Sequence, residues 1–448
     1  MTGKSYEQIN RRITRGEAVV LTAEEVTQMG RQMSAEEIAE KVDVVTTGTF
    51  SPMCSSGAFL NLGHSRPPIR MERISLNGVP ACAGLAAVDA YLGATATASP
   101  GDTYGGAHVI EALIRGEDVR LVAEGKGTDC YPRRRLTRCV SRDTINEMVL
   151  YNPRNAYQNY AAAANSSGRT RYTYMGVLRP DLGNVNYCTA GELSPLLNCP
   201  DLQTVGLGTR VFLCGAQGYI VGRGTQFDTS VAMNGRGIPL AGAATLALSG
   251  DMRQMEGRWV RAAYYPGYGV SLFVGVGIPI PVLNAEVAAA VSVSNDDIYT
   301  RVLDFGREDH PVLGVLTYSQ LQSGTVELSG RRIRTSPLSS LHRARLIALE
   351  LRAWIERGEF LLTEPVQSLT QPEPIRCDVD GAGGERAPEP EGSLPGCIHC
   401  GACTSACDWG ALCLLPDGTV RHDATRCRSC GRCADACPLQ LLPPGGRG

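Results

Sequence analysis

The chain has 448 residues, and its 43 lysines and arginines nearly balance 45 aspartates and glutamates, which gives a formal net charge of −2. This balance argues against a nucleic-acid or anionic-membrane partner, because such proteins carry an excess of positive charge. Hydrophobic residues make up 43% and charged residues 20%, as in a protein with an ordinary folded core. The length predicts two or three domains.

The cysteine content bears on location. The N-terminal segment is polar and lacks an apolar signal-peptide core, and the most apolar stretch, residues 270–293, is interrupted by prolines. That stretch therefore predicts a buried strand, a turn and a helix instead of a membrane span. Seventeen cysteines without a secretory signal predict a cytoplasmic, reducing environment, in which thiols serve as metal ligands or nucleophiles.

The first predicted elements are helices and a strand near the N-terminus. Thr22-x-x-Glu25 and Ser34-x-x-Glu37 both match the capping box, so a helix is predicted to begin at each. Residues 42–46 are apolar and β-branched, which predicts a short buried strand.

Two cysteines along the following stretch are candidate nucleophiles. Cys54 follows the predicted strand in a loop rich in hydroxyl groups and glycine, whose donors can stabilise a thiolate. Cys130 lies in a second loop, with Lys126 before it and three arginines, including Arg133, close behind it. Positive charge favours a thiolate there and could also hold a carboxylate substrate. The alternative is that each is an ordinary buried cysteine, and this reading is preferred for Cys82, Cys139, Cys188, Cys199 and Cys214.

Later segments continue the alternation of strands and helices. Residues 210–213, 219–221 and 270–276 predict strands separated by glycines, and residues 339–358 predict one amphipathic helix that ends at Gly358. No glycine-rich run completes a dinucleotide or Walker A motif, so a nucleotide cofactor is not supported. The predicted fold is an α/β, or α+β, large catalytic domain with a small α+β domain like a bacterial ferredoxin.

Composition divides the chain into three parts. Residues 1–364 form the predicted catalytic domain, residues 365–394 a linker rich in proline and glycine, and residues 395–442 a ferredoxin domain. Cys377 lies within the linker and is assigned no role.

The last fifty or so residues repeat one cysteine spacing. It is C-x2-C-x2-C-x3-C, the spacing of a bacterial ferredoxin that holds two [4Fe–4S] clusters, in which the fourth cysteine of each repeat ligates the other cluster. Four-cysteine zinc ribbons are the alternative, and the doubled spacing disfavours them. Asp408 replaces the usual proline after the first repeat, and Cys413, outside both repeats, is predicted to be buried and apolar. The predicted ligand sets are Cys397, Cys400, Cys403 and Cys437 for one cluster and Cys427, Cys430, Cys433 and Cys407 for the other.

Long segments of residues 5–357 resemble the homocysteine biosynthesis family. The resemblance covers the stretch from Val44 through Cys54 to Asn61, together with Leu76-Asn-Gly-Val-Pro80, Gly208-Thr-Arg-Val-Phe-Leu213, Gly224-Thr-Gln226, Gly250-Asp-Met-Arg253, Gly267-Tyr-Gly-Val-Ser-Leu272, Gly275-Val-Gly-Ile-Pro-Ile-Pro281 and Pro337-Leu-Ser-Ser340. Three features depart from the family pattern: no tandem CBS region follows, Phe227 stands where a histidine is expected, and Cys214 stands where glycine is usual.

The resemblance implies an L-aspartate semialdehyde sulfurtransferase that makes homocysteine with sulfide as the ultimate sulfur source. Such enzymes are often partnered by a separate small ferredoxin. The ferredoxin domain at the C-terminal end of this chain fits that partnership. For such a reaction we hypothesise that Cys54 carries a persulfide, that Cys130 acts as a second thiol and that the clusters deliver two electrons. Candidate groups for binding the substrate are Thr46, Thr47, Ser55, Ser56, Asn77 and Arg133.

Two other functions stay open from the sequence. The chain could be another ferredoxin-linked sulfur-transfer enzyme or thiol reductase, or it could be a non-catalytic electron relay. In every reading the clusters need an electron donor. A homo-oligomer is left open, and neither nucleic acid nor membrane is predicted as a partner.

Overall fold

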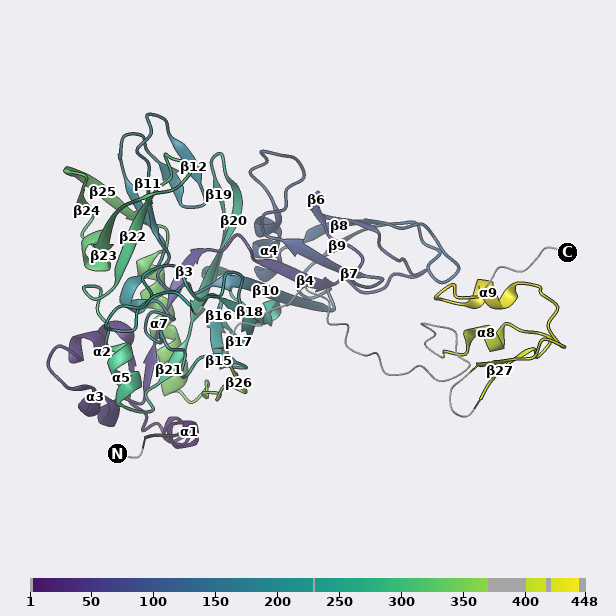
Figure 1. Ribbon diagram of the computed structural model, residues 1–448, viewed down its shortest axis with the longest axis horizontal. Coiled ribbons are helices and arrows are strands. Elements are labelled where there is room, and N and C mark those ends of the chain that lie inside the picture. Colours follow the sequence, from purple (N-terminus) through teal and green to yellow (C-terminus); the bar gives the residue numbers. More distant parts are fainter. Residues whose placement is uncertain (1–2, 229, 370–399, 416–419, 443–448) are drawn as a thin grey trace. The chain divides into compact units, whose positions relative to one another are not determined.

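The computed structural model describes residues 3–228, 230–369, 400–415 and 420–442. The chain divides into two compact units, Met1–Pro372 and Glu373–Gly448. The larger unit is built mainly from β-sheets with a few helices, and the smaller unit combines two short helices with one β-hairpin (Figure 1). This mixed α/β architecture confirms the predicted fold class.

A nine-stranded sheet forms the centre of the larger unit. Its neighbouring strands pair antiparallel, and β3 (Thr49–Pro52) joins it by pairing with β20 beside the main path. The main path contains, in order, β19 (Val260–Tyr265), β20 (Gly269–Gly277), β16 (Arg210–Leu213), β17 (Ala216–Arg223), β18 (Leu246–Asp251), β10 (Glu147–Asn155), β4 (Gly57–Asn61) and β7 (Asp89–Gly93).

A six-stranded sheet with its own apolar core lies in the same unit. It mixes parallel and antiparallel pairs, and β14 is parallel to β25 but antiparallel to β11. Its strands are, in order, β23 (Val312–Thr317), β22 (Tyr299–Asp304), β11 (Ala162–Ala164), β14 (Val185–Tyr187), β25 (Arg331–Pro337) and β24 (Thr325–Leu328).

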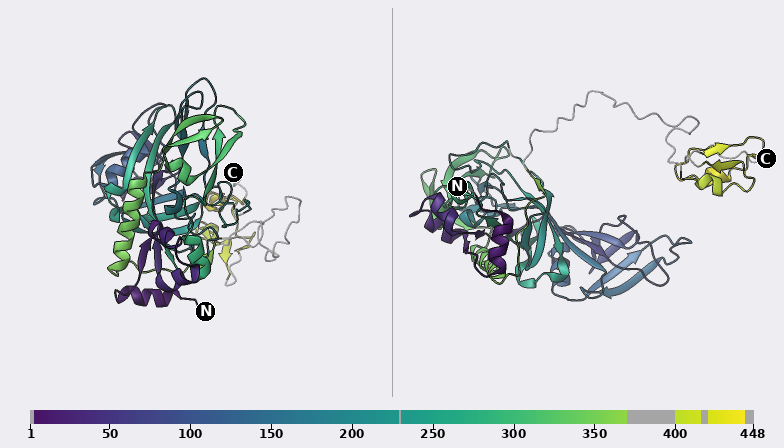
Figure 2. Two further views of the ribbon diagram at one scale, coloured as in Figure 1. Left: turned by 90° about the vertical axis from the view of Figure 1, so that its left-hand side faces the viewer. Right: turned by 90° about the horizontal axis from the view of Figure 1, so that it is seen from below.

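Smaller sheets complete the β-structure. A four-stranded antiparallel sheet lies at the end of the larger unit that is remote from the N-terminal helices (Figures 1 and 2). Its strands are β6 (Val79–Ala81), β5 (Arg73–Leu76), β8 (Val119–Glu124) and β9 (Arg135–Val140). The remaining strands are β1 (Val20–Thr22), β2 (Val44–Thr46) and β21 (Pro279–Pro281) in one sheet, and the pairs β12 (Arg171–Thr173) with β13 (Gly176–Leu178), β15 (Gly206–Leu207) with β26 (Gln367–Ser368), and β27 (Leu412–Leu414) with β28 (Val420–His422).

Helix α7 (Leu341–Glu356) packs against β1, β2, β3 and β20 and buries Ile347 and Leu351. Gly48 allows this close approach, because a Cβ atom at this position would lie 2.2 Å from the Ala344 carbonyl oxygen. The packing therefore fixes the segment that leads into β3 and Cys54. The other helices are α1 (Tyr6–Thr14), α2 (Ala23–Met29), α3 (Ala35–Lys41), α4 (Gly106–Ile114), α5 (Ala285–Val291), α6 (Tyr318–Gln322), α8 (Ala402–Ser405) and α9 (Arg432–Ala436).

The structure confirms most of the predicted elements. Capping boxes at Thr22 and Ser34 start α2 and α3, and the predicted strand at residues 210–213 is β16. Residues 339–358 contain α7, and Gly358 has a φ of 73°, as the predicted left-handed stop requires. Residues 270–293 form strand, strand and helix, namely β20, β21 and α5. Within the described part of the chain, no helix is both long and apolar enough to cross a bilayer.

Three predictions of buried cysteines are wrong. Cys82, Cys139 and Cys413 are exposed, whereas Cys199 and Cys214 are buried as predicted and Cys188 is half-buried. Cys139 lies on β9, an edge strand whose alternate side chains face solvent, so its apolar neighbours do not bury it. Cys413 lies on the short hairpin strand β27, where too few elements surround it for burial. Most of the predicted linker, including Cys377, lies outside the described residues, although its first part contributes β26.

Candidate active site around Cys54

Strand pairing places Cys54 beside the start of β20. Pro52 at the end of β3 pairs with Phe273, and the Met53 amide donates to the Leu272 carbonyl at 2.7 Å. The next side chain, Cys54, therefore meets Ser271, whose buried hydroxyl lies 3.2 Å from the Cys54 sulfur. A half-buried cysteine sulfur thus faces a fixed hydroxyl group, and either group can donate the hydrogen bond.

A second hydroxyl reaches the same sulfur from the turn between β19 and β20. The Tyr268 hydroxyl donates to the Cys54 sulfur at 3.4 Å. Burial, this hydrogen bond and the nearby charge of Cys54 raise the pKa of Tyr268 well above its usual value. Tyr268 therefore stays protonated and remains a hydrogen-bond donor throughout the neutral range.

The buried side-chain amide of Asn152 supports the loop that carries Cys54. The Ser56 hydroxyl donates to the Met53 carbonyl at 2.7 Å. Asn152, which is fully buried, donates to the Ser56 hydroxyl at 3.0 Å and contacts the Met53 sulfur at 3.1 Å. These contacts fix the backbone on both sides of Cys54, so its sulfur has a defined position.

The end of β10 adds a cation and an aromatic ring to the site. Its pairing with β18 is interrupted by a bulge between Asn152 and Asn155, and such bulges re-aim side chains. Arg154 lies within this bulge, with its guanidinium carbon 5.8 Å from the centre of the Tyr157 ring. Burial raises the pKa of Tyr157, and the Arg154 charge partly opposes this rise.

Four tyrosine rings form a continuous series of contacts that reaches the Cys54 sulfur at Tyr268. We call Tyr157, Tyr160, Tyr174 and Tyr268 the tyrosine cluster. Their ring centres lie 4.5 Å apart for Tyr157 and Tyr160, and 6.3 Å apart both for Tyr160 and Tyr174 and for Tyr174 and Tyr268. Tyr174 comes from the turn of the β12–β13 hairpin, so the cluster joins three separate segments, and Tyr268 connects it to Cys54.

Cys188, just after β14, is a second thiol in this neighbourhood. Burial raises its pKa to about 12, and the charge of Cys54 adds to the rise. It lines a small cavity of about 20 Å³ together with Met53 and Tyr157. A cavity of this size holds about one water molecule. At neutral pH Cys188 is therefore a protonated thiol next to a small enclosed space.

The six residues predicted to bind substrate are separated in the structure. Thr47 exchanges hydrogen bonds with the Ile278 backbone at 2.8 and 3.1 Å, and Thr46 is fully buried, 3.5 Å from the Leu21 carbonyl. Ser56 supports the Cys54 loop, and Ser55 is half-buried in the same loop. Asn77 lies in the turn between β5 and β6, where it caps the Arg120 amide at 2.7 Å. Of the predicted residues, only Ser55 and Ser56 therefore lie in the loop that carries Cys54.

Cys130 lies in the turn between β8 and β9 and is exposed. Arg133, in the same turn, donates to the Arg66 carbonyl at 2.6 Å, and its amide donates to the Pro68 carbonyl. Neither Arg66 nor Pro68 contacts Cys54. The structure therefore does not bring Cys130 and Arg133 together with Cys54, and their predicted roles stay predictions.

Sequence reasoning missed Ser271, Tyr268, Arg154 and Tyr157. Ser271 and Tyr268 lie within Gly267-Tyr-Gly-Val-Ser-Leu272, one of the segments that carry the family resemblance, and this segment could have marked them. Arg154 and Tyr157 belong to no such segment. Their approach to Cys54 depends on sheet pairings across about a hundred or more residues.

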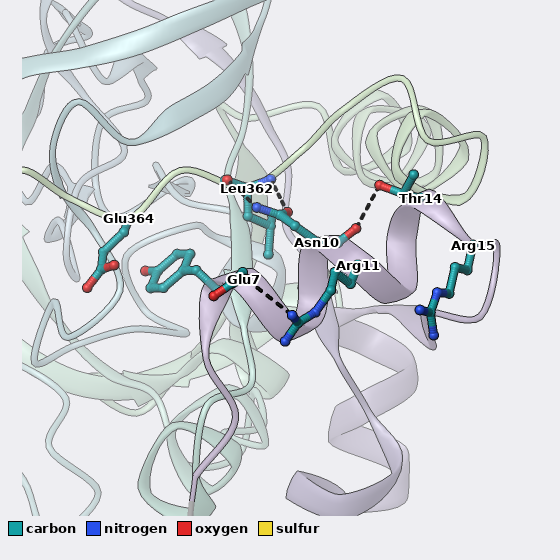
Figure 3. A pocket seen from close by; sticks show the side chains of 8 residues that line it. Glu7, Asn10, Arg11, Thr14, Arg15, Leu362 and Glu364 are labelled. Carbon is teal, nitrogen blue, oxygen red and sulfur yellow. Dashed lines mark hydrogen bonds and ion pairs between the residues drawn. The ribbon is translucent and has the colours of Figure 1, made fainter.

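A surface groove of about 510 Å³ lies between α1 and residues 362–364 (Figure 3). Asn10 pairs with the backbone of Leu362 through two hydrogen bonds of 2.9 Å, and Arg11 pairs with Glu7 at 3.1 Å. Asn10, Arg11 and Glu7 thus already have partners, and neither Cys54 nor any predicted site residue lines the groove. We do not assign a reaction to it.

The smaller unit shows the twofold repeat of the cysteine pattern. In each repeat a glycine with positive φ follows a cysteine and begins a helix, Gly401 before α8 and Gly431 before α9. Asp408, which replaces the usual proline, forms an ion pair with Arg432 at the start of α9. At the position where a proline is usual, this chain thus has an aspartate that forms an ion pair with the other repeat.

The cysteine environment fits an iron–sulfur group. The Ala411 amide donates to the Cys407 sulfur at 3.3 Å, and the Ser429 amide donates to the Cys427 sulfur at 3.4 Å. Backbone N–H groups lower the pKa of both Cys407 and Cys437, which favours the thiolate form that binds metal. Among the described residues no three metal-binding side chains converge on one point, and Cys397 lies outside them. The predicted ligand sets therefore stay predictions.

Removing either hydroxyl at the Cys54 sulfur is expected to slow its alkylation. Each hydrogen bond stabilises the thiolate by about 0.5–1.5 kcal/mol, so Ser271→Ala and Tyr268→Phe should each slow the reaction with iodoacetamide roughly 2- to 12-fold. Peptide-resolved mass spectrometry measures the rate at Cys54 alone. Ser292→Ala, which removes a hydroxyl bonded to the Ala288 carbonyl, is the control. Unchanged rates in both site variants would show that the contacts have no effect on reactivity.

The comparisons with known proteins agree with this organisation. A family model described as homocysteine biosynthesis enzyme, sulfur-incorporation, matches residues 18–362, and a 4Fe-4S dicluster domain model matches residues 396–441. No solved structure matches the chain.

Two similar proteins carry the name L-aspartate semialdehyde sulfurtransferase. The one from Methanosarcina acetivorans is 49% identical over 374 residues, which cover 83% of this chain and 73% of the relative. The one from Methanocaldococcus jannaschii is 46% identical over 391 residues, which cover 83% of this chain and 74% of the relative. The chain therefore belongs to the homocysteine biosynthesis family of sulfur-incorporating enzymes and carries a C-terminal [4Fe–4S] dicluster domain.

Proposed function

We propose that this enzyme makes homocysteine from L-aspartate semialdehyde, with inorganic sulfide as the ultimate sulfur source. The observation that carries the proposal is the Cys54 sulfur, held between the Ser271 and Tyr268 hydroxyls under the tyrosine cluster. Family membership and the names of the two similar proteins support the same substrate. A nucleophilic sulfur in a partly closed site is what addition to an aldehyde requires.

The overall reaction needs sulfur, two electrons and two protons. The aldehyde, hydrogen sulfide, two electrons and two protons give the thiol and one water molecule. Sulfur must first add to the carbonyl carbon, and the carbonyl oxygen must then leave as water. The resulting carbon–sulfur double bond takes up the two electrons and two protons to give the thiol. A sulfur-transfer site and an electron source are therefore both needed.

Cys54 is the proposed carrier of the sulfur. Sulfide attacks a disulfide between Cys54 and a second thiol, which breaks the S–S bond and leaves a persulfide on Cys54 and a thiolate on its partner. The terminal persulfide sulfur adds to the aldehyde carbon. The second thiolate then attacks the Cys54 sulfur, which reforms the disulfide and releases the sulfur with the substrate. The disulfide is regenerated, so the cycle consumes no oxidant.

Two residues at the Cys54 sulfur would support the addition. As sulfur bonds to carbon, negative charge develops on the carbonyl oxygen, and Tyr268, which stays protonated, can donate a hydrogen bond to it. Ser271 is buried and can hold the attacking sulfur in place. Hydrogen-bond donors fixed in advance stabilise such a transition state without reorganisation.

Cys130 is the proposed second thiol. This role requires the β8–β9 turn to reach Cys54, from which its contacts with Arg66 and Pro68 are separate. Cys188 is the alternative that the site geometry favours, because it lines a small cavity together with Met53, the residue before Cys54. A disulfide trapped by oxidation and located by peptide mapping distinguishes the two cysteines.

The C-terminal domain is proposed to hold two [4Fe–4S] clusters, with Cys397, Cys400, Cys403 and Cys437 on one and Cys427, Cys430, Cys433 and Cys407 on the other. Bound clusters supply single electrons, which suits a two-electron reduction in two steps. Residues 1–364 are the proposed catalytic domain, residues 365–394 the linker and residues 395–442 the electron-carrying domain. An external electron donor is required to reload the domain.

An anaerobic assay with labelled sulfide tests the proposal. The enzyme, with its iron–sulfur groups reconstituted and chemically reduced, is supplied with aspartate semialdehyde and sulfide labelled with sulfur-34. Mass spectrometry should find the label in homocysteine and in a persulfide on the Cys54 peptide. A labelled Cys54 persulfide without homocysteine would overturn the proposed acceptor, and the absence of both would overturn the sulfur-transfer scheme itself.

A further inference from the structure

We propose that the Arg154 guanidinium is the carboxylate-binding group of the Cys54 site and selects aldehydes that carry a carboxylate. The identity of the aldehyde rests on the proposed function above, whereas the carboxylate site rests on the geometry of the described residues. Three observations carry the inference: the backbone around Arg154, its lack of an acidic partner, and its position relative to Cys54.

The backbone presents Arg154 at a specialised point of the sheet. Arg154 and Pro153 form the extra residues of the bulge at the end of β10, between the paired residues Asn152 and Asn155. The loop of residues 224–226 is tied to this bulge, because the Thr225 amide donates to the Pro153 carbonyl at 2.7 Å. Gln226, in that loop, accepts a hydrogen bond from the Arg154 guanidinium. Gln226 has a φ of 68°, so a strained backbone holds this acceptor in place.

No carboxylate neutralises Arg154 within the part of the chain that the structure describes. Its guanidinium contacts the neutral Gln226 side chain and the Tyr157 ring, and none of the ion pairs found within 4.0 Å includes it. Its Nε atom is buried and has no hydrogen-bond partner. A guanidinium that no carboxylate neutralises favours an anionic ligand, which would bind the N–H groups that remain accessible.

The charge of Arg154 acts on the groups that surround Cys54. The pKa values of Tyr157, Tyr268 and Cys188 each respond both to Arg154 and to Cys54, in opposite directions. Tyr268 also touches the Cys54 sulfur directly, at 3.4 Å. The Arg154 guanidinium lies 5.8 Å from the centre of the Tyr157 ring, and Tyr157 lines the small cavity together with Met53, the residue before Cys54. A small anion whose other end lies at the Cys54 sulfur would therefore come within reach of Arg154.

The ligand that fits is a single carboxylate. Arg154 is the cation that lowers the pKa of each of these three groups, so it is the positive charge that the site offers to an anion. A guanidinium binds a carboxylate through parallel N–H bonds, and one guanidinium matches the single charge of a carboxylate better than the double charge of a phosphate. An amino-acid aldehyde could thus place its carboxylate on Arg154 and its carbonyl carbon at Cys54.

Alkylation of Cys54 tests the site without any turnover. Iodoacetate carries a carboxylate and iodoacetamide is its neutral analogue, so the ratio of their rates at Cys54 reports on a nearby cation. In Arg154→Met this ratio is expected to fall roughly 10- to 100-fold, the range for a lost hydrogen bond to a charged group. Arg154→Lys should retain part of the preference, because the charge remains while the planar fork is lost.

Arg210→Met is the matched control. Arg210 also lies 5.8 Å from an aromatic ring, that of Phe360, and also has a buried Nε atom without a partner, but its described contacts are with residues 361 and 363. In Arg210→Met the ratio of the iodoacetate rate to the iodoacetamide rate at Cys54 should equal that of the wild type. An unchanged ratio in Arg154→Met, or an equal fall in Arg210→Met, would overturn the carboxylate site.

The substrate preference is tested with a truncated aldehyde. 3-Aminopropanal is aspartate semialdehyde without its carboxylate. Arg154→Met should lose roughly 10- to 100-fold in kcat/KM for aspartate semialdehyde and change little for 3-aminopropanal. Equal losses for both aldehydes would overturn the selectivity role. If the wild type converts neither aldehyde, the proposed function fails, and the alkylation ratio still decides the carboxylate site.

Discussion

Replacing Cys54 by serine is expected to lower homocysteine formation by at least about 10³-fold, because the sulfur carrier is lost and a hydroxyl cannot hold a persulfide. The Ser271 and Tyr268 hydroxyls would still be present, so substrate binding should persist while the chemical step stops. The expected pattern is therefore a collapse of kcat with little change in the apparent affinity for aspartate semialdehyde. Steady-state assays under reducing, anaerobic conditions measure both quantities.

The control for Cys54→Ser is Cys139→Ser, an exposed cysteine on the edge strand β9 that should retain full activity. Cys130→Ser and Cys188→Ser then identify the second thiol. Only the true partner should abolish the disulfide with Cys54 when the protein is oxidised. A Cys54→Ser variant that keeps more than about a tenth of the wild-type rate would contradict the carrier role, since losing a covalent nucleophile costs far more.

The cysteines were the most predictable part of the candidate site. Cys54 follows a strand that is recognised from a short run of apolar, β-branched residues. The ferredoxin repeat is recognised from a fixed cysteine spacing, so both features can be identified from short stretches of sequence. Ser271 could not be placed in this way, because it lies 217 residues from Cys54 along the chain and reaches it only through the pairing of β3 with β20. Pairings over such distances depend on the whole sheet and not on local preference.

Arg154 illustrates a second limit. Its position depends on a bulge, and the local sequence Asn152-Pro-Arg-Asn155 reads equally well as a turn. The sequence instead singled out Arg133, because three arginines adjoin a cysteine there. In the structure Arg133 donates to the Arg66 backbone in an exposed turn, whereas the Arg154 guanidinium lies 5.8 Å from the Tyr157 ring, and none of its described contacts is with a carboxylate. Charge clustering along the chain is visible in the sequence, whereas a charge left without a carboxylate partner can be recognised only in three dimensions.

Removing cluster ligands is expected to separate sulfur loading from reduction. Cys427→Ser should lower the iron content from about eight to about four atoms per chain, because each [4Fe–4S] cluster needs its four thiolates. Homocysteine formation should fall to the level found without reductant, since one of the two electron carriers is missing. The Cys54 persulfide should still form, because sulfide attacks the disulfide between Cys54 and the second thiol in that step, which needs no electrons from the clusters. Iron analysis, the thiol assay and peptide mass spectrometry measure the three effects.

Paired substitutions test which cysteines share a cluster. If the fourth cysteine of each repeat crosses to the other cluster, Cys407 and Cys427 hold the same one, so the double variant should lose no more iron than either single variant. Cys427→Ser combined with Cys437→Ser should instead lose nearly all of the iron. Cys413→Ser is the matched control, because Cys413 is an exposed cysteine of the same unit outside both repeats and should leave the iron content unchanged. Near-complete loss in the Cys407 and Cys427 double variant would mean that each repeat binds its own cluster, and the electron-carrying domain would then be built differently from the crossed arrangement.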